Sequence, residues 1–461
     1  MPAPALDTFN WQPQPMAQKL VSELVIDFLS RCPGAAELAR HMKTDSGTRF
    51  ADWIDFIEEP ASPTLKKRLL ETGFTHEPAP GAPDCYIHKG AIFPAVLLSA
   101  DRTTRVGIKV DSVDDFLATW KLDHPVEGEC LTQFRRVRCF TGTDAEMWAV
   151  ERHGWRGFEP VPASPAVALA AARHLEAFRR RSRDYGIGPE ADLRGFARAM
   201  ALIDSAIDDL GRDWTCDLFF QAERDFWQRR NRAARVQKAR QDALGLGWAN
   251  HDHHTYRSSR AFYPQLISAL EKLGFHSRER FYAGAEAGWG AQVLEQPVTG
   301  ITIFADVDMS PEELQGDFAH EGFAAEKDDA GTIGLWCDLH GEAFLQAGMH
   351  HLECIFDWHA LKDQLALEAQ IRTMDPFTTF PYLRQAFTQG ERWPVDPRRT
   401  ELALSRGHIT AAQAENFRAF GAVGSHLENL ERNDGFKGFN QTGVSQIIAK
   451  TDPRKLAGAG T

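Results

Sequence analysis

Beyond Gly247 the chain repeats one order of predicted elements twice: a strand, a helix and then further strands. The first pass covers residues 251–309 and the second covers residues 347–432, with a helical insertion predicted at residues 397–420. Short runs rich in β-branched and aromatic residues predict the strands, and apolar residues at three- and four-residue spacing predict the helices. Two such βαβββ-like modules commonly pair their curved sheets around one cleft. The predicted fold class is therefore α+β, with paired βαβββ modules around a central cleft.

The rest of the chain divides by the same patterns. Residues 1–160 are predicted to form an α+β cap, helical over residues 17–73 and then rich in short strands around a helix at residues 112–120. Its strand–helix–strand–strand order resembles a degenerate βαβββ module, but it lacks paired histidines on a first strand. We therefore expect a non-catalytic cap or a dimer surface, and a homodimer is one expected assembly. Residues 161–246 are predicted to be a helical connector, which leaves residues 247–461 as the catalytic domain.

Charge and cysteine content exclude several classes of protein. The formal net charge is −12 and the pI is about 5.8, so the chain lacks the positive field that nucleic acids and anionic membranes require. We find no apolar run of the roughly 18 residues that a transmembrane helix needs, and the N-terminal segment lacks the features of a signal peptide. The seven cysteines include no C-x-x-C pair, which is typical of reduced thiols. We expect a cytoplasmic protein without nucleic-acid or membrane partners.

Histidines are concentrated on the first strand of each repeat, in HDHH and in HH. Because strand side chains alternate between faces, His253 and Arg257 share one face, whereas His254 points the other way. In the second repeat, His351 shares a face with Glu353, and His350 lies on the more apolar face. The pattern therefore favours His253 and His351 as candidate ligands and His350 as a packed core residue.

Two neutral imidazoles and one carboxylate on neighbouring strands form a 2-His-1-carboxylate set, which is typical of non-haem Fe(II) sites that bind a chelating substrate and O₂. The last predicted strand supplies the carboxylate candidates Glu428 and Glu431. They are three residues apart and so lie on opposite faces of the strand. Alternation alone leaves the choice between them open.

These residues show a resemblance to known proteins. The paired modules resemble the vicinal oxygen chelate superfamily. More closely, residues 250–450 resemble the 2-oxoadipate dioxygenase/decarboxylase (hydroxyglutarate synthase) family. The similar segments are DHHTYR, HHLE, YLRQAF and the late GSH followed by a glutamate. Residues 1–245 do not share this resemblance.

The resemblance implies roles for individual residues. The metal ligands fall on His253, His351 and Glu431, with Glu428 as the alternative carboxylate. An arginine at the place of Arg257 binds a substrate carboxylate in that family, and the face shared with His253 agrees with this role. The alternative for Arg257 is an ion pair with Asp252 or Glu295. The remaining substrate-binding positions that we carry over are Arg384, Gln385 and Asn440.

The resemblance implies a mononuclear Fe(II) enzyme that uses O₂ to convert a small 2-oxo acid, such as 2-oxoadipate, into a hydroxy acid and CO₂. Its partners would be a small carboxylate substrate and O₂. One alternative keeps the cleft but uses Zn²⁺, Ni²⁺ or Mn²⁺ as a Lewis acid for isomerase or lyase chemistry. Another is a non-catalytic member that only binds a small molecule.

Overall fold

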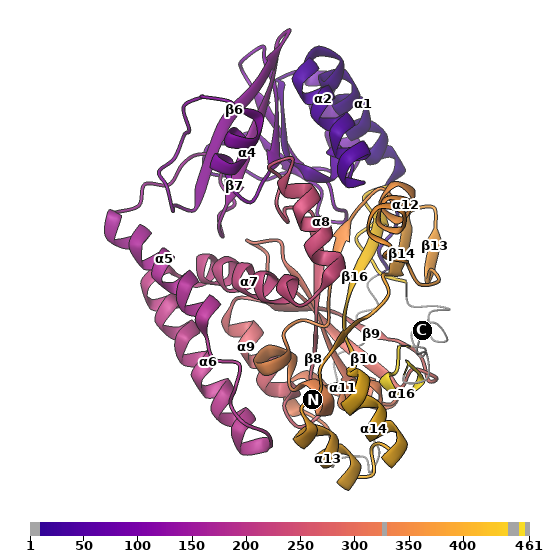
Figure 1. The fold of residues 1–461 in the computed structure, drawn as a ribbon. Helices are drawn as coiled ribbons and strands as arrows, with labels where there is room; N and C mark the ends of the chain where they lie inside the picture. Colours follow the sequence, from indigo (N-terminus) through magenta and orange to yellow (C-terminus); the bar gives the residue numbers. More distant parts are fainter. Residues whose placement is uncertain (1–9, 325–329, 441–450, 457–461) are drawn as a thin grey trace.

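The computed structural model describes residues 10–324, 330–440 and 451–456, which form two β-sheets and the helices that cover them (Figure 1). The N-terminal part of the chain builds a seven-stranded sheet, and the C-terminal part builds a nine-stranded sheet. No helix within the described ranges is long and apolar enough to cross a lipid bilayer.

The nine-stranded sheet consists of two βαβββ modules that meet at their first strands. Strand β8 pairs in parallel with β11, the last strand of the first module, and β12 pairs in parallel with β16, the last strand of the second. The two first strands, β8 and β12, run antiparallel to each other at the centre of the sheet. The predicted α+β fold with paired modules is therefore confirmed. The elements are β8 (His251–Arg257), α9 (Tyr263–Lys272), β9 (His276–Tyr282), β10 (Trp289–Glu295), β11 (Thr302–Asp308), β12 (His351–Ile355), α12 (Trp358–Ala369), β13 (Thr378–Phe380), β14 (Leu383–Phe387), β15 (Glu391–Trp393) and β16 (Ala422–Arg432).

The seven-stranded sheet repeats this topology. Its first strand β1 pairs in parallel with β4, and β5 pairs in parallel with β7, while β1 and β5 run antiparallel at the centre. This strand order resembles that of the C-terminal sheet, and the division into a cap at residues 1–160 and a connector at residues 161–246 stays a prediction. The elements are α1 (Pro15–Arg31), α2 (Pro33–His41), η1 (Met42–Ser46), η2 (Phe50–Trp53), β1 (Ile54–Pro60), α3 (Pro63–Glu71), β2 (Thr75–His76), β3 (Cys85–Ile87), β4 (Ala95–Ser99), β5 (Thr104–Lys109), α4 (Val113–Trp120), β6 (Phe134–Gly142) and β7 (Ala145–Arg152).

Two predicted elements differ from the structure. Strand β1 lies within residues 17–73, which the sequence predicts as helical throughout. The prediction missed this strand because its short alternating run is flanked on both sides by helical segments. Within the second repeat, the run IRTMDPF predicts a strand at residues 371–377, whereas the strand forms at residues 378–380 of β13. The helical insertion predicted at 397–420 is present as α13 (Pro397–Ser405) and α14 (Ala411–Phe420).

The helices of residues 161–246 do more than connect the two sheets. Phe219, Phe220 and Trp227 of α7 are fully buried in the same hydrophobic core as the nine-stranded sheet. Apolar burial therefore joins this region to the sheet that carries the candidate site. These helices are α5 (Pro165–Arg180), α6 (Pro189–Leu210), α7 (Arg212–Arg229) and α8 (Arg232–Asp242), and the remaining elements are η3 (Glu313–Gln315), α10 (Phe318–Glu321), α11 (Thr332–His340), η4 (Ala343–Ala347) and α16 (Pro453–Leu456).

We predict that Ile303→Ala lowers the free energy of unfolding by about 2–5 kcal/mol, because it leaves a cavity in a packed core. Ile303 lies on β11 and is 0% exposed. The control is Leu367→Ala on α12, where the side chain is 84% exposed and the expected change is within about 0.5 kcal/mol. Urea unfolding followed by circular dichroism measures both. Equal effects of the two substitutions would contradict this assignment of the core.

Candidate metal centre

Strand β8 presents alternate residues to a buried cavity. His253, Thr255 and Arg257 line this cavity, whereas His254 and Tyr256 lie on the other face of the sheet and pack against Phe220 of α7. The predicted face shared by His253 and Arg257 is therefore confirmed.

The register between β8 and β12 brings a second histidine and a glutamate to the same place. Glu353 lies opposite His253, and His351 lies opposite Thr255. His253 Nε2 is 2.9 Å from Glu353 Oε1, and His351 Nε2 contacts the same oxygen. Glu353 is 0% exposed, so both imidazoles converge on a carboxyl group that solvent does not reach.

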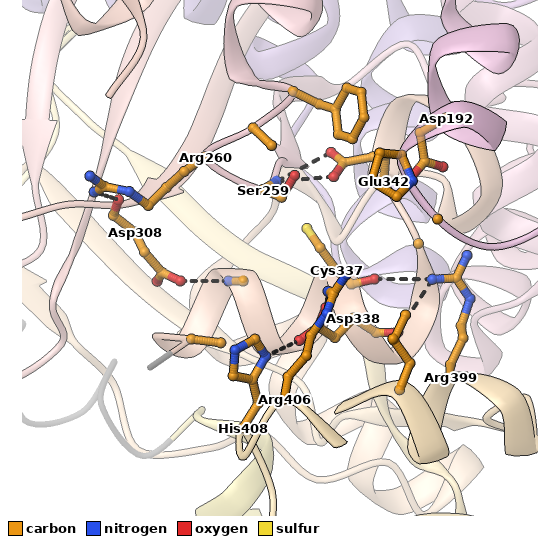
Figure 2. Close-up of a pocket in the computed structure, with 18 of the residues that line it drawn as sticks. Asp192, Ser259, Arg260, Asp308, Cys337, Asp338, Glu342, Arg399, Arg406 and His408 are labelled. Atoms are coloured by element: carbon orange, nitrogen blue, oxygen red, sulfur yellow. Dashed lines mark hydrogen bonds and ion pairs between the residues drawn. The ribbon is translucent and has the colours of Figure 1, made fainter. Parts of the chain in front are cut away.

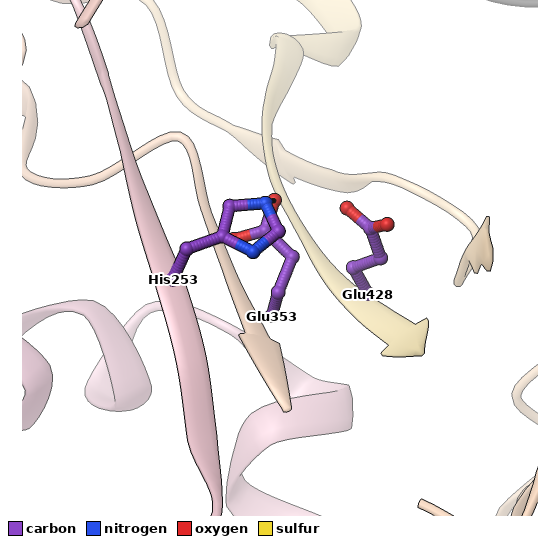
Figure 3. A group of neighbouring side chains, drawn as sticks. All are labelled: His253, Glu353 and Glu428. Carbon is purple, nitrogen blue, oxygen red and sulfur yellow. Dashed lines mark ion pairs between the residues drawn. The ribbon is translucent and has the colours of Figure 1, made fainter. Parts of the chain in front are cut away.

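Strand β16 adds the fourth donor. Glu428 lies beside Glu353 in the parallel register, and its Oε2 is 3.9 Å from His351 Nε2. Figure 3 shows His253, Glu353 and Glu428 directed toward one another from three neighbouring strands. One ligand atom from each of these three residues lies within 4.8 Å of the others, which is a spacing suited to one metal ion.

Burial sets the charge of these groups. It lowers the pKa of His253 and lowers that of His351 well below the ordinary value, so both rings are neutral and offer a lone pair. Burial also raises the pKa of Glu428 to about 7 and, together with the charge of Glu428, raises that of Glu353 well above its usual range. A buried cation would offset this desolvation, so the donor set fits a divalent metal.

A carboxylate outside the cluster fixes the orientation of His253. Its Nδ1 lies 2.6 Å from Asp252 Oδ2, and Asp252 also accepts from Arg432 at 2.7 Å. Although burial acts to raise the pKa of Asp252, the Arg432 charge and the His253 hydrogen bond hold it below its ordinary value. An Nδ1–H bonded to a carboxylate leaves Nε2 free as a ligand atom, which is the usual support for a metal-binding histidine.

The structure separates the two glutamates that the sequence left as alternatives. Glu428 faces the cavity, whereas Glu431 lies on the opposite face of β16. There Glu431 accepts hydrogen bonds from the Trp358 backbone N–H at 2.8 Å and from Arg384 at 3.2 Å. Glu431, the carboxylate that the resemblance implied, therefore does not join the histidines, and Glu428 does.

Of the other predicted substrate-binding residues, some line the cavity and one lies on the opposite face of the sheet. Gln385 lines the cavity and donates to Glu428 Oε1 at 2.9 Å, whereas its neighbour Arg384 pairs with Glu431 away from the cavity. Asn440 lines the cavity. Arg257 lines it too, and neither expected alternative partner holds it, since Asp252 pairs with Arg432 and Glu295 pairs with Lys437 and Arg278.

The cavity has a volume of about 60 Å³, and six of the residues that line it are phenylalanine or tryptophan. Its polar groups are concentrated at the histidine–glutamate cluster and at Arg257 with Asp306 of β11. Apolar walls of this kind exclude water and contact the carbon skeleton of a ligand. The aromatic residues are Phe281, Trp289, Phe304, Phe377, Phe387 and Phe439.

A second, larger cavity of about 210 Å³ lies at the end of β8 and beside α11 (Figure 2). Its charged side chains already have partners: Asp338 pairs with Arg406 and His408, and Glu342 accepts from Ser259. We therefore place the candidate site in the smaller cavity, where the donors converge.

Sequence reasoning missed Glu353 and Asp306. Glu353 shares a face with His351 in the segment HHLE, and this alternation was the signal that could have identified it. Asp306 gives no comparable signal, because only the pairing of β11 with β8 places it beside Arg257.

Comparisons with known proteins return matches among solved structures only; no family model and no curated protein matched. A variant of 4-hydroxymandelate synthase from Streptomyces coelicolor is 13% identical, with 75% of this chain and 96% of that chain covered and a TM-score of 0.26. A putative glyoxalase superfamily protein from Ralstonia eutropha is 11% identical, with 60% and 99% covered and a TM-score of 0.32. Methylmalonyl-CoA epimerase from Mycobacterium tuberculosis is 14% identical, with 40% and 88% covered and a TM-score of 0.23. Because these TM-scores are low, we assign the fold from the strand order of this chain and not from these similarities.

We predict that Glu428→Gln reduces divalent-metal affinity at least tenfold, whereas Glu431→Gln leaves it unchanged. The reason is that Glu428 faces the two histidines and Glu431 faces the opposite side of β16. Isothermal titration calorimetry with Co²⁺ measures both affinities on proteins whose folding is checked by circular dichroism. Loss of metal in Glu431→Gln with retention in Glu428→Gln would reverse the assignment.

Proposed function

We propose that this chain is a mononuclear Fe(II)-dependent dioxygenase/decarboxylase that acts on a small 2-oxo acid such as 2-oxoadipate. The observation that carries the proposal is that His253 and His351 both contact Glu353 and that Glu428 lies beside them, at the wall of a cavity lined by aromatic side chains. Two neutral imidazoles and one carboxylate are the donor set most often used by non-haem iron in oxygen chemistry.

The metal fits the residues that are present. His253, His351 and Glu428 would hold it, and Fe(II) bound there would supply the redox chemistry that decarboxylation and hydroxylation by O₂ need. Glu353 and Glu428 lie close enough to share a hydrogen bond, which requires that one of them carries a proton. With the proton on Glu353, the ionised donor set reduces to two histidines and one carboxylate.

The protein residues orient the substrate and keep water out. Arg257 would bind a carboxylate of the acid through its guanidinium, since burial lowers its pKa only to about 10 and the group stays protonated at neutral pH. Gln385 holds the Glu428 carboxylate, and Asp252 holds the His253 ring. The aromatic walls contact the carbon skeleton and shield the reacting atoms from water.

Glu353 favours a second candidate function. Its Oε1 lies 2.9 Å from His253 Nε2, and one ligand atom each from His253, Glu353 and Glu428 lies within 4.8 Å of the others. If Glu353 is a fourth ligand, His253, His351, Glu353 and Glu428 would hold the metal together, and the metal would polarise a bound substrate without needing O₂. The centre would then act as a Lewis acid in isomerase or lyase chemistry.

We predict that the Fe(II)-loaded protein consumes O₂ and releases CO₂ in equal amounts when a 2-oxo acid substrate is added. An oxygen electrode and trapping of CO₂ measure the two gases across a series of 2-oxo acids. His253→Ala and His351→Ala should abolish both metal binding and O₂ uptake, with Glu431→Gln as the matched control. Full metal occupancy in both histidine variants would rule out this site, and turnover without O₂ uptake would favour the Lewis acid.

Glu353→Gln distinguishes the two ligand sets directly. If three residues hold the metal, we expect one Co²⁺ per chain with an absorption spectrum like that of the unsubstituted protein, because the amide can still donate a hydrogen bond to Glu428. Visible spectroscopy of the Co²⁺ protein and metal analysis provide the readouts. A changed Co²⁺ spectrum together with weaker binding would instead identify Glu353 as a fourth ligand.

A further inference from the structure

An arginine and an aspartate line the cavity without bonding to each other. Arg257 on β8 and Asp306 on β11 are neighbours in the parallel register of these strands, and both line the cavity. They are 3% and 1% exposed. Among the described residues, neither forms an ion pair within 4.0 Å, and both Asp306 carboxyl oxygens and Arg257 Nε are buried without a hydrogen-bond partner.

This arrangement is costly unless something enters the cavity. A buried polar group without a partner loses its hydration and gains nothing in return. Both groups therefore keep hydrogen-bonding capacity for a ligand.

The neighbours of Asp306 leave it without a donor. On β10 its paired residue is Ala291, which offers only a methyl group. Asp308, two residues further along β11, is satisfied because it accepts from the backbone N–H groups of Ile333 and Gly334 at the start of α11. Of these two aspartates, the one without a partner is therefore Asp306, which lines the same cavity as the histidines and glutamates.

The charged groups around Asp306 decide what it can bind. Burial raises the pKa of Asp306 well above its usual range, the charge of Asp308 adds to this effect, and the charge of Arg257 opposes it. A neutral Asp306 donates one hydrogen bond, whereas Arg257 keeps its positive charge. Together the two groups match a carboxylate, which accepts hydrogen bonds and balances the arginine charge.

We propose that Asp306 is a specificity-determining residue that donates a hydrogen bond to the substrate carboxylate bound by Arg257. This inference rests on the proposed function, because it assigns one end of that substrate. The cluster of histidines and glutamates would receive the 2-oxo-carboxylate, and Arg257 with Asp306 would receive a second carboxylate. An acid with a methyl group at that end would leave Arg257 and Asp306 buried without partners. Sites built to hydrogen-bond a polar group bind an analogue that lacks this group far more weakly.

Binding of a matched pair of acids tests the inference without requiring turnover. The probes are 2-oxoadipate and 2-oxohexanoate, which have equal chain lengths and differ in one terminal carboxylate. Calorimetry on the Co²⁺-loaded protein should show at least tenfold tighter binding of 2-oxoadipate. Asp306→Asn keeps a hydrogen-bond donor and should retain this preference within about threefold.

Asp306→Leu removes the donor and should reduce the preference at least tenfold while leaving the affinity for 2-oxohexanoate unchanged. Glu431→Gln is the control on the opposite face of the sheet and should behave like the unsubstituted protein. Three results would overturn the inference: no preference in the unsubstituted protein, an unchanged preference in Asp306→Leu, or a tenfold gain of 2-oxoadipate affinity in Asp306→Asn. Tight binding of 2-oxoadipate without O₂ uptake by the Fe(II) protein would leave the inference intact and reject the proposed function.

Discussion

The antiparallel pairing of β8 with β12 is the constraint on which the site depends. This register places Glu353 opposite His253 and His351 opposite Thr255, and the parallel pairing of β12 with β16 adds Glu428 to the same face. Side chains alternate along a strand, so a slip of one residue would turn each donor on the shifted strand away from the cavity. Residues on the opposite face are buried in the core and penalise such a slip. Core packing and the candidate chemistry therefore depend on the same hydrogen-bond ladder.

The seven-stranded sheet shows that this topology does not by itself create a metal site. Its central strands β1 and β5 meet antiparallel, as β8 and β12 do, and each pairs in parallel with the last strand of its own module. Yet within the described part of the chain the one group of donors close enough for a metal contains His253, Glu353 and Glu428, with His351 in contact with Glu353. The chemistry therefore comes from the side chains on the cavity face of the C-terminal sheet, and the fold supplies only their positions.

Local sequence patterns predicted the features that depend on one strand at a time. Strand alternation placed His253 with Arg257, and the repeat of elements predicted the paired modules. Alternation also separated Glu428 from Glu431, but it does not state which face of β16 meets the cavity, because that depends on pairing with β12 and β14. The roles of Glu353 and Asp306 require the same non-local information. Strand β1 was missed because its short run lies between helices that dominate the local pattern.

Charge balance connects the ligand set to the substrate. A divalent ion with an ionised Glu428 and a neutral Glu353 has one net positive charge, which suits the anionic 2-oxo-carboxylate end of an acid. Arg257 beside a neutral Asp306 supplies a second positive charge, so the buried cavity becomes neutral when a dicarboxylate binds. If Glu353 also ionises as a ligand, the metal with its two carboxylates has no net charge. Arg257 is then the one positive charge left in the cavity, and a monocarboxylate balances it. Under the proposed function, the number of ionised carboxylates beside the metal would therefore set the charge of the preferred substrate.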